Sequence, residues 1–179
     1  MEIDDQTLID RVLDKGDQHA FSELVKRYQS QLRYSLRQLT GWDEALADDL
    51  AQETFLKAYK SLKQFQGKAK FFTWLYRIAY NCFAAYYRSH KAELQLDEAD
   101  IPDPGFNPEL ASDLHRDFAR ALKAFEPQQR MALHLSFQRQ LSHGEISELM
   151  EIPLGTVKSY ISRGQEKLKQ QMMSWQPGV

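Results

Sequence analysis

The sequence lacks most of the features that mark disulfide-bonded, membrane-spanning or metal-binding proteins. It has one cysteine, Cys82, so an internal disulfide and a cysteine-rich metal site are both excluded. No apolar run approaches the roughly 20 residues that span a bilayer, and the N-terminus is acidic, unlike a signal peptide. The mean hydropathy of −0.58 indicates a heavily charged surface. We therefore expect a cytoplasmic protein that does not insert into a membrane.

Histidines are few and scattered, which disfavours a catalytic role. No pair has the spacing of metal ligands with a further ligand nearby. The best acid–base candidate pairs His143 with Glu145, but this glutamate also suits a helix cap. We expect no catalytic residue, no metal and no cofactor, and a small helical enzyme is one alternative to test. The histidines are His19, His90, His115, His134 and His143.

Charges of one sign are missing from two neighbouring segments, although the net charge is only −2. Residues 66–91 contain five basic residues and no acid. Residues 92–115 contain seven acids and neither lysine nor arginine. This segregation of charge is more informative about binding partners than the net charge is, because each segment presents its own electrostatic surface.

The acidic block also holds three prolines and a glycine between residues 102 and 108. Proline excludes helix at its own position and disfavours it at the preceding one, and the charge density disfavours burial. We predict that residues 92–111 form an acidic, flexible linker. It joins two units, residues 1–91 and residues 112–179.

Helical periodicity dominates both units, and few stretches alternate as strands do, so we predict an all-α protein. Gly16 separates the first two helices, and Pro127 suits a first helical turn. The predicted helices are residues 4–15, 17–40, 43–65 and 71–89 in the first unit, and residues 112–125, 127–139, 143–150 and 155–171 in the second.

The end of the second unit has the pattern of a helix-turn-helix. Ser142 and Glu145 form a capping box, and we predict that Thr156 caps the last helix. The last helix has an apolar side and a side of short polar and basic groups, which suit base edges in a major groove. An ordinary helical hairpin with a solvated face is the common alternative. The apolar side is Val157, Ile161, Gly164 and Leu168; the polar side is Ser159, Ser162, Arg163 and Glu166, flanked by Lys158 and Lys167.

The helix predicted from Phe71 has an unusual outward face. Its inward side is expected to be Leu75, Ala79, Cys82 and Tyr86. The outward side combines aromatic, amide and guanidinium groups, the chemistry that binds single-stranded nucleic acid. The alternative is that its aromatics pack in a core, as large aromatics usually do. The outward residues are Thr73, Trp74, Arg77, Tyr80, Asn81, Ala84 and Arg88.

The helix predicted over residues 43–65 carries an acidic patch with an apolar residue at its centre. It is either a solvated surface, with Glu53 and Lys57 as an ordinary i,i+4 pair, or a docking face for a basic partner. The patch is Asp48, Asp49, Gln52, Glu53, Leu56 and Lys60.

Four segments together resemble the extracytoplasmic-function (ECF) sigma factors, the small promoter-recognition subunits of bacterial RNA polymerase. They are AFSELVKRYQSQL, DDLAQETFLKAYKSLKQFQG, FFTWLYRIAYN and LSHGEISELMEIPLGTVKSYISRGQEKL. They cover almost the whole chain in order, with the acidic segment where the family has its linker.

The resemblance implies that core polymerase and promoter DNA are the partners. The third helix would dock on the clamp helices of the β′ subunit, and the second unit would contact the β flap. The first unit would hold the melted minus-ten strand, with one base extruded into a pocket of the loop 65–70 and the next helix head. The last helix would contact the duplex minus-thirty-five element. An anti-sigma protein, either soluble or membrane-anchored, would cover the third helix.

The residues that the resemblance implies fall into three groups. For core polymerase they are Asp48, Asp49, Gln52, Glu53 and Leu56; for the minus-ten element Phe65, Lys68, Lys70, Phe71, Trp74, Arg77, Tyr80, Asn81 and Arg88; and for the minus-thirty-five element Thr156, Lys158, Ser159, Tyr160, Ser162 and Arg163.

Three positions depart from the family's pattern, so the promoter sequence does not follow from the resemblance. Ala85 stands where many members have an acid, Tyr160 where Arg is common and Gly164 where Ala is common. We expect Gly164 to weaken its helix by about 1 kcal/mol relative to alanine. A stand-alone helix-turn-helix regulator is a further alternative, but it would need a dimer face or sensor domain and would leave the acidic patch unexplained.

Overall fold

The computed structural model describes residues 3–90, 121–122 and 124–173. This part of the chain is helical and contains no strand, which confirms the predicted all-α class. The predicted linker and nearly all of the helix predicted over residues 112–125 lie outside the described residues. The elements are α1 (Asp5–Lys15), α2 (Gln18–Leu39), α3 (Glu44–Ser61), a short 3₁₀ helix (Leu62–Gln64), α4 (Phe71–Ser89), α7 (Pro127–Phe137), α8 (His143–Met150) and α9 (Leu154–Met173).

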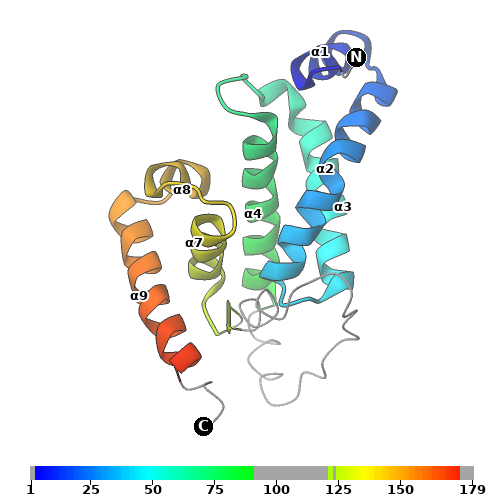
Figure 1. Cartoon of the computed structure of the whole chain (residues 1–179). Coiled ribbons are helices and arrows are strands. Elements are labelled where there is room, and N and C mark those ends of the chain that lie inside the picture. Colours follow the sequence, from blue (N-terminus) through cyan, green and yellow to red (C-terminus); the bar gives the residue numbers. More distant parts are fainter. Residues whose placement is uncertain (1–2, 91–120, 123, 174–179) are drawn as a thin grey trace.

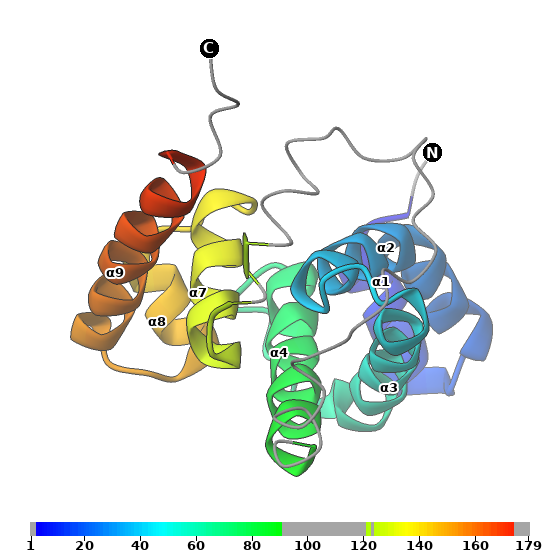
Figure 2. The same ribbon diagram turned by 90° about the horizontal axis from the view of Figure 1, so that it is seen from below.

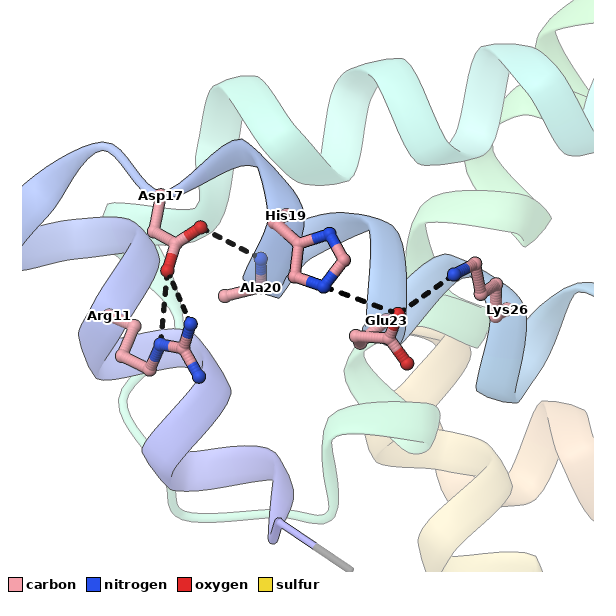
Figure 3. Close-up of polar contacts among 6 residues, drawn as sticks. All are labelled: Arg11, Asp17, His19, Ala20, Glu23 and Lys26. Carbon is pink, nitrogen blue, oxygen red and sulfur yellow. Dashed lines mark hydrogen bonds and ion pairs between the residues drawn. The ribbon is translucent and has the colours of Figure 1, made fainter.

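The joint between α1 and α2 is built from a glycine and a capping aspartate. Gly16 has a φ of 63°, in the left-handed region, and ends α1. Asp17 accepts the amide of Ala20 at 3.1 Å, which caps α2, and also binds Arg11 of α1 at 2.7 Å (Figure 3). The amide of Ala20 and, next, the Arg11 hydrogen bond lower the pKa of Asp17. One carboxylate therefore fixes the angle between the two helices.

Helix α3 ends four residues before the predicted limit. The chain leaves the α-helix at Ser61, makes one 3₁₀ turn, and is extended at Phe65. The ring of Phe65 lies 5.7 Å from that of Phe71 and 5.5 Å from that of Trp74, centroid to centroid. Periodicity alone extended the helix to Phe65 because the residue is apolar, but its side chain packs on α4 instead.

In α8 and α9 the structure confirms one predicted cap and corrects another. Ser142 and Glu145 form the capping box, with the Ser142 amide donating to the Glu145 carboxylate at 2.8 Å. Thr156 is not a cap, because α9 begins at Leu154. Thr156 lies inside the first turn of α9, where its own amide donates to the carbonyl of Pro153 at 2.9 Å.

Gly164 lies on the buried side of α9 against Leu133 of α7. A Cβ at Gly164 would stand 2.4 Å from Cδ2 and 2.9 Å from Cγ of Leu133, which is fully buried. The expectation that this glycine merely weakens the helix is therefore incomplete. It also permits the close approach of α9 to α7.

We predict that Gly164→Ala lowers the free energy of unfolding. Overpacking costs about 1–3 kcal/mol, which exceeds the gain of roughly 1 kcal/mol in helix propensity. Urea denaturation measures the difference. Gly155→Ala is the matched control, because no atom lies within 4 Å of its added Cβ. It should cause no loss, and an equal loss in both variants would contradict the prediction.

The two units pack against each other. Helix α4 lies between α3 on one side and α7 and α8 on the other, as both views show (Figures 1 and 2). A single cluster of buried apolar side chains includes members of α1–α4 and of α7–α9. A sequence pattern does not decide whether two linked units touch; in the structure they share a core.

Arg130 of α7 is buried at this contact, with 6% of its surface exposed. Its guanidinium donates to the carbonyl of Leu39 at 2.8 Å and to the hydroxyl of Tyr87 at 3.2 Å, both in the N-terminal unit. It also donates to the carbonyl of Phe125 at 3.2 Å and lies 5.1 Å from the centroid of the Tyr87 ring. One side chain thus joins α7 to the end of α2 and to α4.

His134 of α7 is fully buried at the same contact. Its Nε2 lies 3.4 Å from the hydroxyl of Tyr76 in α4, and the two rings are stacked. Its Nδ1 has no hydrogen-bond partner among the described residues. Burial, and secondarily the charge of Arg139, lower the pKa of His134 to about 3. The imidazole is therefore neutral in the packed form at ordinary pH.

Candidate polymerase and promoter interfaces

The acidic patch of α3 is on the surface. Asp49, Gln52, Glu53 and Leu56 are exposed, and Leu56 has 62% of its surface open to solvent. Glu53 pairs with Lys57 at 2.7 Å, as an i,i+4 spacing predicts, and this hydrogen bond is the main cause of the raised pKa of Lys57. Single exposed apolar side chains are common on protein surfaces, so Leu56 by itself does not identify a partner surface.

Asp48 differs from the rest of the patch. It is half-buried, and its carboxylate lies 3.4 Å from the guanidinium of Arg33 in α2. The sequence pattern placed it with the docking residues because it shares their face of the helix. Its contact with α2 gives it a second, structural role.

The loop before α4 and the head of that helix form the edge of a cavity. Lys68 and Lys70 are exposed, Phe65 is half-buried and Phe71 is buried, with 3% of its surface exposed. The cavity has a volume of about 340 Å³. It is lined by Asp5, Gln6 and Ile9 of α1, Tyr28 and Gln31 of α2, Phe65, Gly67, Ala69 and Lys70 of the loop, and Phe71 and Phe72 of α4.

The predicted outward face of α4 is only partly outward. Asn81 and Arg88 are exposed and Trp74 is half-buried. Arg77 is half-buried and forms an ion pair with Glu151, at the end of α8. The expectation that Tyr80 faces outward is wrong for this arrangement, because only 5% of its surface is exposed.

The C-terminal unit covers Tyr80. Burial, and next the neighbouring Tyr160, raise the pKa of Tyr80, whereas Arg88 and a hydrogen bond with the Gln128 side chain oppose the rise. A helical wheel gives the direction of a side chain and not the element that lies in that direction. The packing of α7 and α8 on α4 therefore could not be read from residues 71–89.

The apolar and polar sides of α9 are placed as predicted. Val157, Ile161, Gly164 and Leu168 are buried. Lys158, Ser162 and Arg163 are exposed, whereas Thr156 and Ser159 are half-buried. Tyr160 is half-buried and turned toward α7, where its hydroxyl donates to Gln128 at 3.0 Å. The protruding polar surface of α9 is therefore narrower than the sequence suggested.

Several residues at these sites escaped sequence reasoning. Asp5 and Gln31 line the cavity from helices far from the loop in sequence, and no local pattern connects them. For Arg130 and His134 the sequence held only a weak indication of burial, because each is followed in the helix by an apolar residue, Met131 and Leu135. Polar residues inside such a helix are buried only where another element supplies their partners.

Comparison with known families gives the class of the protein. Residues 24–93 match the model of sigma-70 region 2, and residues 115–168 match that of sigma-70 region 4. Region 2 contains the α3 patch and the α4 face, and region 4 contains the helix-turn-helix. The fold and these surfaces define a sigma subunit of the sigma-70 type.

Full-length relatives give the family. The chain is 35% identical over 181 residues to the ECF RNA polymerase sigma-E factors of Salmonella typhi and Escherichia coli, with 93% of each chain covered. It is 32% identical over 182 residues to that of Haemophilus influenzae, covering 94% of this chain and 95% of the relative. The chain belongs to the ECF family of RNA polymerase sigma factors.

Solved structures agree with this family. The sigma factor RpoE of Bartonella quintana, in complex with the anti-sigma factor NepR, matches 87% of this chain and 98% of its own, with a TM-score of 0.71 and 26% identity. CnrH, in complex with the cytosolic domain of CnrY, matches 96% and 99%, with a TM-score of 0.68 and 25% identity.

Family membership decides between the alternatives. The protein is a transcription initiation factor that directs core RNA polymerase to promoters, and it is not an enzyme. A stand-alone helix-turn-helix regulator is excluded as well, because region 2 is present. Within the described residues, no helix has the length and apolar character that crossing a membrane demands.

Proposed function

We propose that the three surfaces serve three partners: the α3 patch binds core polymerase, the loop 65–70 with α4 holds the melted minus-ten strand, and α9 contacts the minus-thirty-five duplex. On this proposal residues 1–91 form the unit for core and minus-ten binding, residues 92–111 the linker and residues 112–179 the minus-thirty-five unit. The observation that carries it is the division of α9 into a buried apolar side and an exposed side with Lys158, Ser162 and Arg163.

The α3 patch docks on the clamp helices of the β′ subunit. Its exposed acids supply charge complementarity to a basic surface, and Leu56 supplies apolar contact at the centre. Acidic residues on the rim would set the rate of encounter more than the final affinity. The C-terminal unit would reach the β flap at the same time.

Strand binding by α4 requires a movement of the C-terminal unit. Arg77 is paired with Glu151 and Tyr80 is covered, so neither can contact DNA while α7 and α8 lie against α4. Asn81, Arg88, Lys68 and Lys70 are open in the packed form. Binding of the melted strand by α4 therefore implies that α7 and α8 separate from α4 when the protein is bound to polymerase.

Arg163→Ala tests the role of α9. Loss of an arginine at base edges should weaken recognition of the minus-thirty-five element by about 1–3 kcal/mol and leave core binding unchanged. Gel shifts with polymerase and promoter variants measure the change. Lys169→Ala is the control, an exposed basic residue roughly 120° away around the helix at about 100° per residue. Normal transcription by Arg163→Ala from cognate promoters would refute the assignment.

Asn81→Ala tests strand opening. The variant should keep minus-thirty-five binding and lose open complex, because the exposed amide is proposed to contact an unstacked base. We expect a defect of about 1–3 kcal/mol, seen as lower permanganate reactivity of the melted strand. Arg163→Ala serves as the reciprocal control, with defective closed-complex binding. Equal permanganate reactivity in Asn81→Ala and the wild type would show that this residue has no part in opening.

A cytoplasmic anti-sigma domain is the proposed regulator, and the cytoplasm is the proposed location. RpoE is bound to the anti-sigma factor NepR, and CnrH to the cytosolic domain of CnrY, in their structures. The inhibitor would cover the α3 patch and so compete with core polymerase. Simultaneous capture of polymerase and inhibitor through this patch would contradict the competition.

The decisive experiment is reconstitution with bacterial core polymerase. Promoter-specific transcription should depend on this chain, and run-off transcription from genomic fragments would identify the promoters. Core polymerase that gains no promoter selectivity from the chain would refute the proposed roles together.

A further inference from the structure

One side of α9 is held by α7 and by the residues just before it. Helices α7 and α9 lie side by side (Figures 1 and 2). The family resemblance gave Tyr160 to the minus-thirty-five element, and the sequence pattern placed Lys167 beside the polar side of α9. The two residues are seven apart, so they point within roughly 20° of each other at about 100° per residue. In the structure both bind residues 124–129.

Tyr160 is held through its hydroxyl and through its backbone. The hydroxyl donates to the side-chain oxygen of Gln128 at 3.0 Å, and the carbonyl accepts from the side-chain amide of Gln129 at 3.2 Å. Both glutamines lie in the first turn of α7, which begins at Pro127. A side chain that reads a base edge presents its polar end to the groove, whereas the polar end of Tyr160 is bonded within its own unit.

Lys167 repeats this arrangement two turns further along α9. Its ammonium group donates to the carbonyl of Ala124 at 3.0 Å and lies 5.0 Å from the centroid of the Phe125 ring. Phe125 is buried in the small apolar cluster that includes Leu133 of α7 and Leu168 of α9. The cation is therefore directed at a carbonyl and an aromatic ring of its own unit, and not at a DNA phosphate.

These contacts fix the rotation of α9 about its own axis. Between Tyr160 and Lys167, Gly164 brings the helix against Leu133, where even an added Cβ would stand 2.4 Å from a methyl carbon. Contacts on one side over two helical turns leave the opposite, polar side facing solvent. Binding groups must be held within roughly 10–20° of the productive direction, so this rotation decides which side chains can reach base edges.

We propose that Tyr160 and Lys167 are positioning residues of the helix that reads the minus-thirty-five duplex, and that they contact no DNA themselves. They hold α9 in the rotation that presents its exposed side, with Lys158, Ser162 and Arg163. The hydrogen bonds lie within the C-terminal unit, so separation of the two units leaves them intact. The inference rests on the proposed binding of the minus-thirty-five duplex by α9.

Salt dependence tests Lys167. Polymerase reconstituted with the full chain is titrated with a promoter duplex at a series of salt concentrations. Each phosphate that a lysine neutralises contributes about 0.9 to the slope of log K against log salt concentration. Lys167→Met keeps the apolar stem over Phe125 and should keep the wild-type slope. Lys158→Met, the matched change on the exposed side, should lower the slope by about 0.9. A fall of about 0.9 in Lys167→Met would overturn its positioning role.

A double-variant cycle tests Tyr160. Tyr160→Phe removes only the hydroxyl, and Gln128→Ala removes the acceptor of the same hydrogen bond. Each should weaken minus-thirty-five binding by about 3-fold, the scale of one hydrogen bond, and the double variant should be no weaker than the weaker single one. Gln128 also bonds to Tyr80 in the packed form, so the cycle is needed to isolate the bond to Tyr160. Normal binding by Gln128→Ala, or effects that multiply, would overturn the inference for Tyr160.

The base preferences give a readout that a general loss of stability does not change. Each base pair of the minus-thirty-five element is varied through all four bases, and polymerase binding is measured. A lost base contact removes the preference at one base pair, whereas a rotated helix weakens the preferences at all the base pairs that it reads. Tyr160→Phe should weaken them together. Loss of the preference at a single base pair would show that Tyr160 reads that base and would overturn the inference.

The outcomes separate the inference from the proposed function. If neither Lys158→Met nor Arg163→Ala changes binding of the minus-thirty-five duplex, α9 does not contact it, and the proposed function fails. If both change binding as expected while Lys167→Met lowers the slope or Tyr160→Phe loses one base preference, α9 binds the duplex and the positioning inference is wrong.

Discussion

Arg130→Ala is expected to detach the C-terminal unit from α4 and to lower the free energy of unfolding by about 3 kcal/mol. The guanidinium donates to the carbonyls of Leu39 and Phe125 and to the hydroxyl of Tyr87. Charge-assisted hydrogen bonds contribute about 1.5–3 kcal/mol each, and a buried acceptor left without its donor costs about 1–3 kcal/mol. The bonds to Leu39 and Tyr87 cross from one unit to the other, so the loss falls mainly on the packing of the units.

Two measurements check this prediction. Urea denaturation gives the stability, and small-angle X-ray scattering should show a larger radius of gyration for the variant. Because separation frees Arg77 and uncovers Tyr80, the free variant should also bind a minus-ten single strand more tightly than the wild type. Arg163→Ala is the matched control, an exposed arginine in the same unit whose loss should change stability by less than about 0.5 kcal/mol. Unchanged scattering and stability in Arg130→Ala would show that the guanidinium does not hold the units together.

Acid is expected to weaken the packing of the two units through His134. The pKa of its imidazole is lowered to about 3 in the packed form, first by burial and then by Arg139, against an ordinary value of about 6.5. Below about pH 6.5 the separated or unfolded form binds a proton that the packed form excludes, so stability present above that pH is lost as pH falls. The loss approaches 1.4 kcal/mol per pH unit and amounts to roughly 3 kcal/mol near pH 4.3.

The groups around His134 make this effect specific. Tyr76 of α4 faces its Nε2, Ser35 of α2 bonds to Tyr76, and Arg139 lies beyond the end of α7. None of these groups is a carboxylate, so among the described residues that face His134 no negative charge would stabilise an imidazolium. Burial raises the pKa of Tyr76 to about 12, so this phenol stays neutral throughout the window.

Stability curves between about pH 7 and pH 5 isolate the histidine, because carboxylates with lowered pKa values titrate below that range. The wild type should lose about 2 kcal/mol over this interval and His134→Phe much less, whatever its absolute stability. His143→Gln is the control, an exposed histidine at the start of α8 that should keep the wild-type slope. A slope in His134→Phe equal to that of the wild type would contradict the prediction.

Helix positions were predictable because their causes are local. The left-handed Gly16, the capping box of Ser142 and Glu145, and the apolar side of α9 each depend on residues a few positions apart. Two local predictions failed at helix ends. Helix α9 begins at Leu154, two residues before the predicted cap Thr156, and Phe65 packs on Trp74 of α4 instead of continuing α3.

The candidate sites were predictable as sets of residue types but not as surfaces. Leu56 and Glu53 lie exposed on α3, as their positions on the helix suggest. Tyr80 occupies an equally plausible outward position on α4 and is buried, because the C-terminal unit packs against this helix. The sequence pattern predicts the direction in which each side chain points from its helix. It does not predict which other helix packs against that side chain.

By itself, the sequence determined the helices, their caps, the acidic patch of α3 and the polar side of α9, because each arises within one or two helical turns. Only the tertiary structure decided that Arg130 and His134 are buried between the units, that Gly164 lies against Leu133, and that Asp5 shares a cavity with the loop 65–70. These contacts join residues tens of positions apart. They exist because the burial of a shared apolar core outweighs the cost of enclosing polar groups, provided that each group finds its partner.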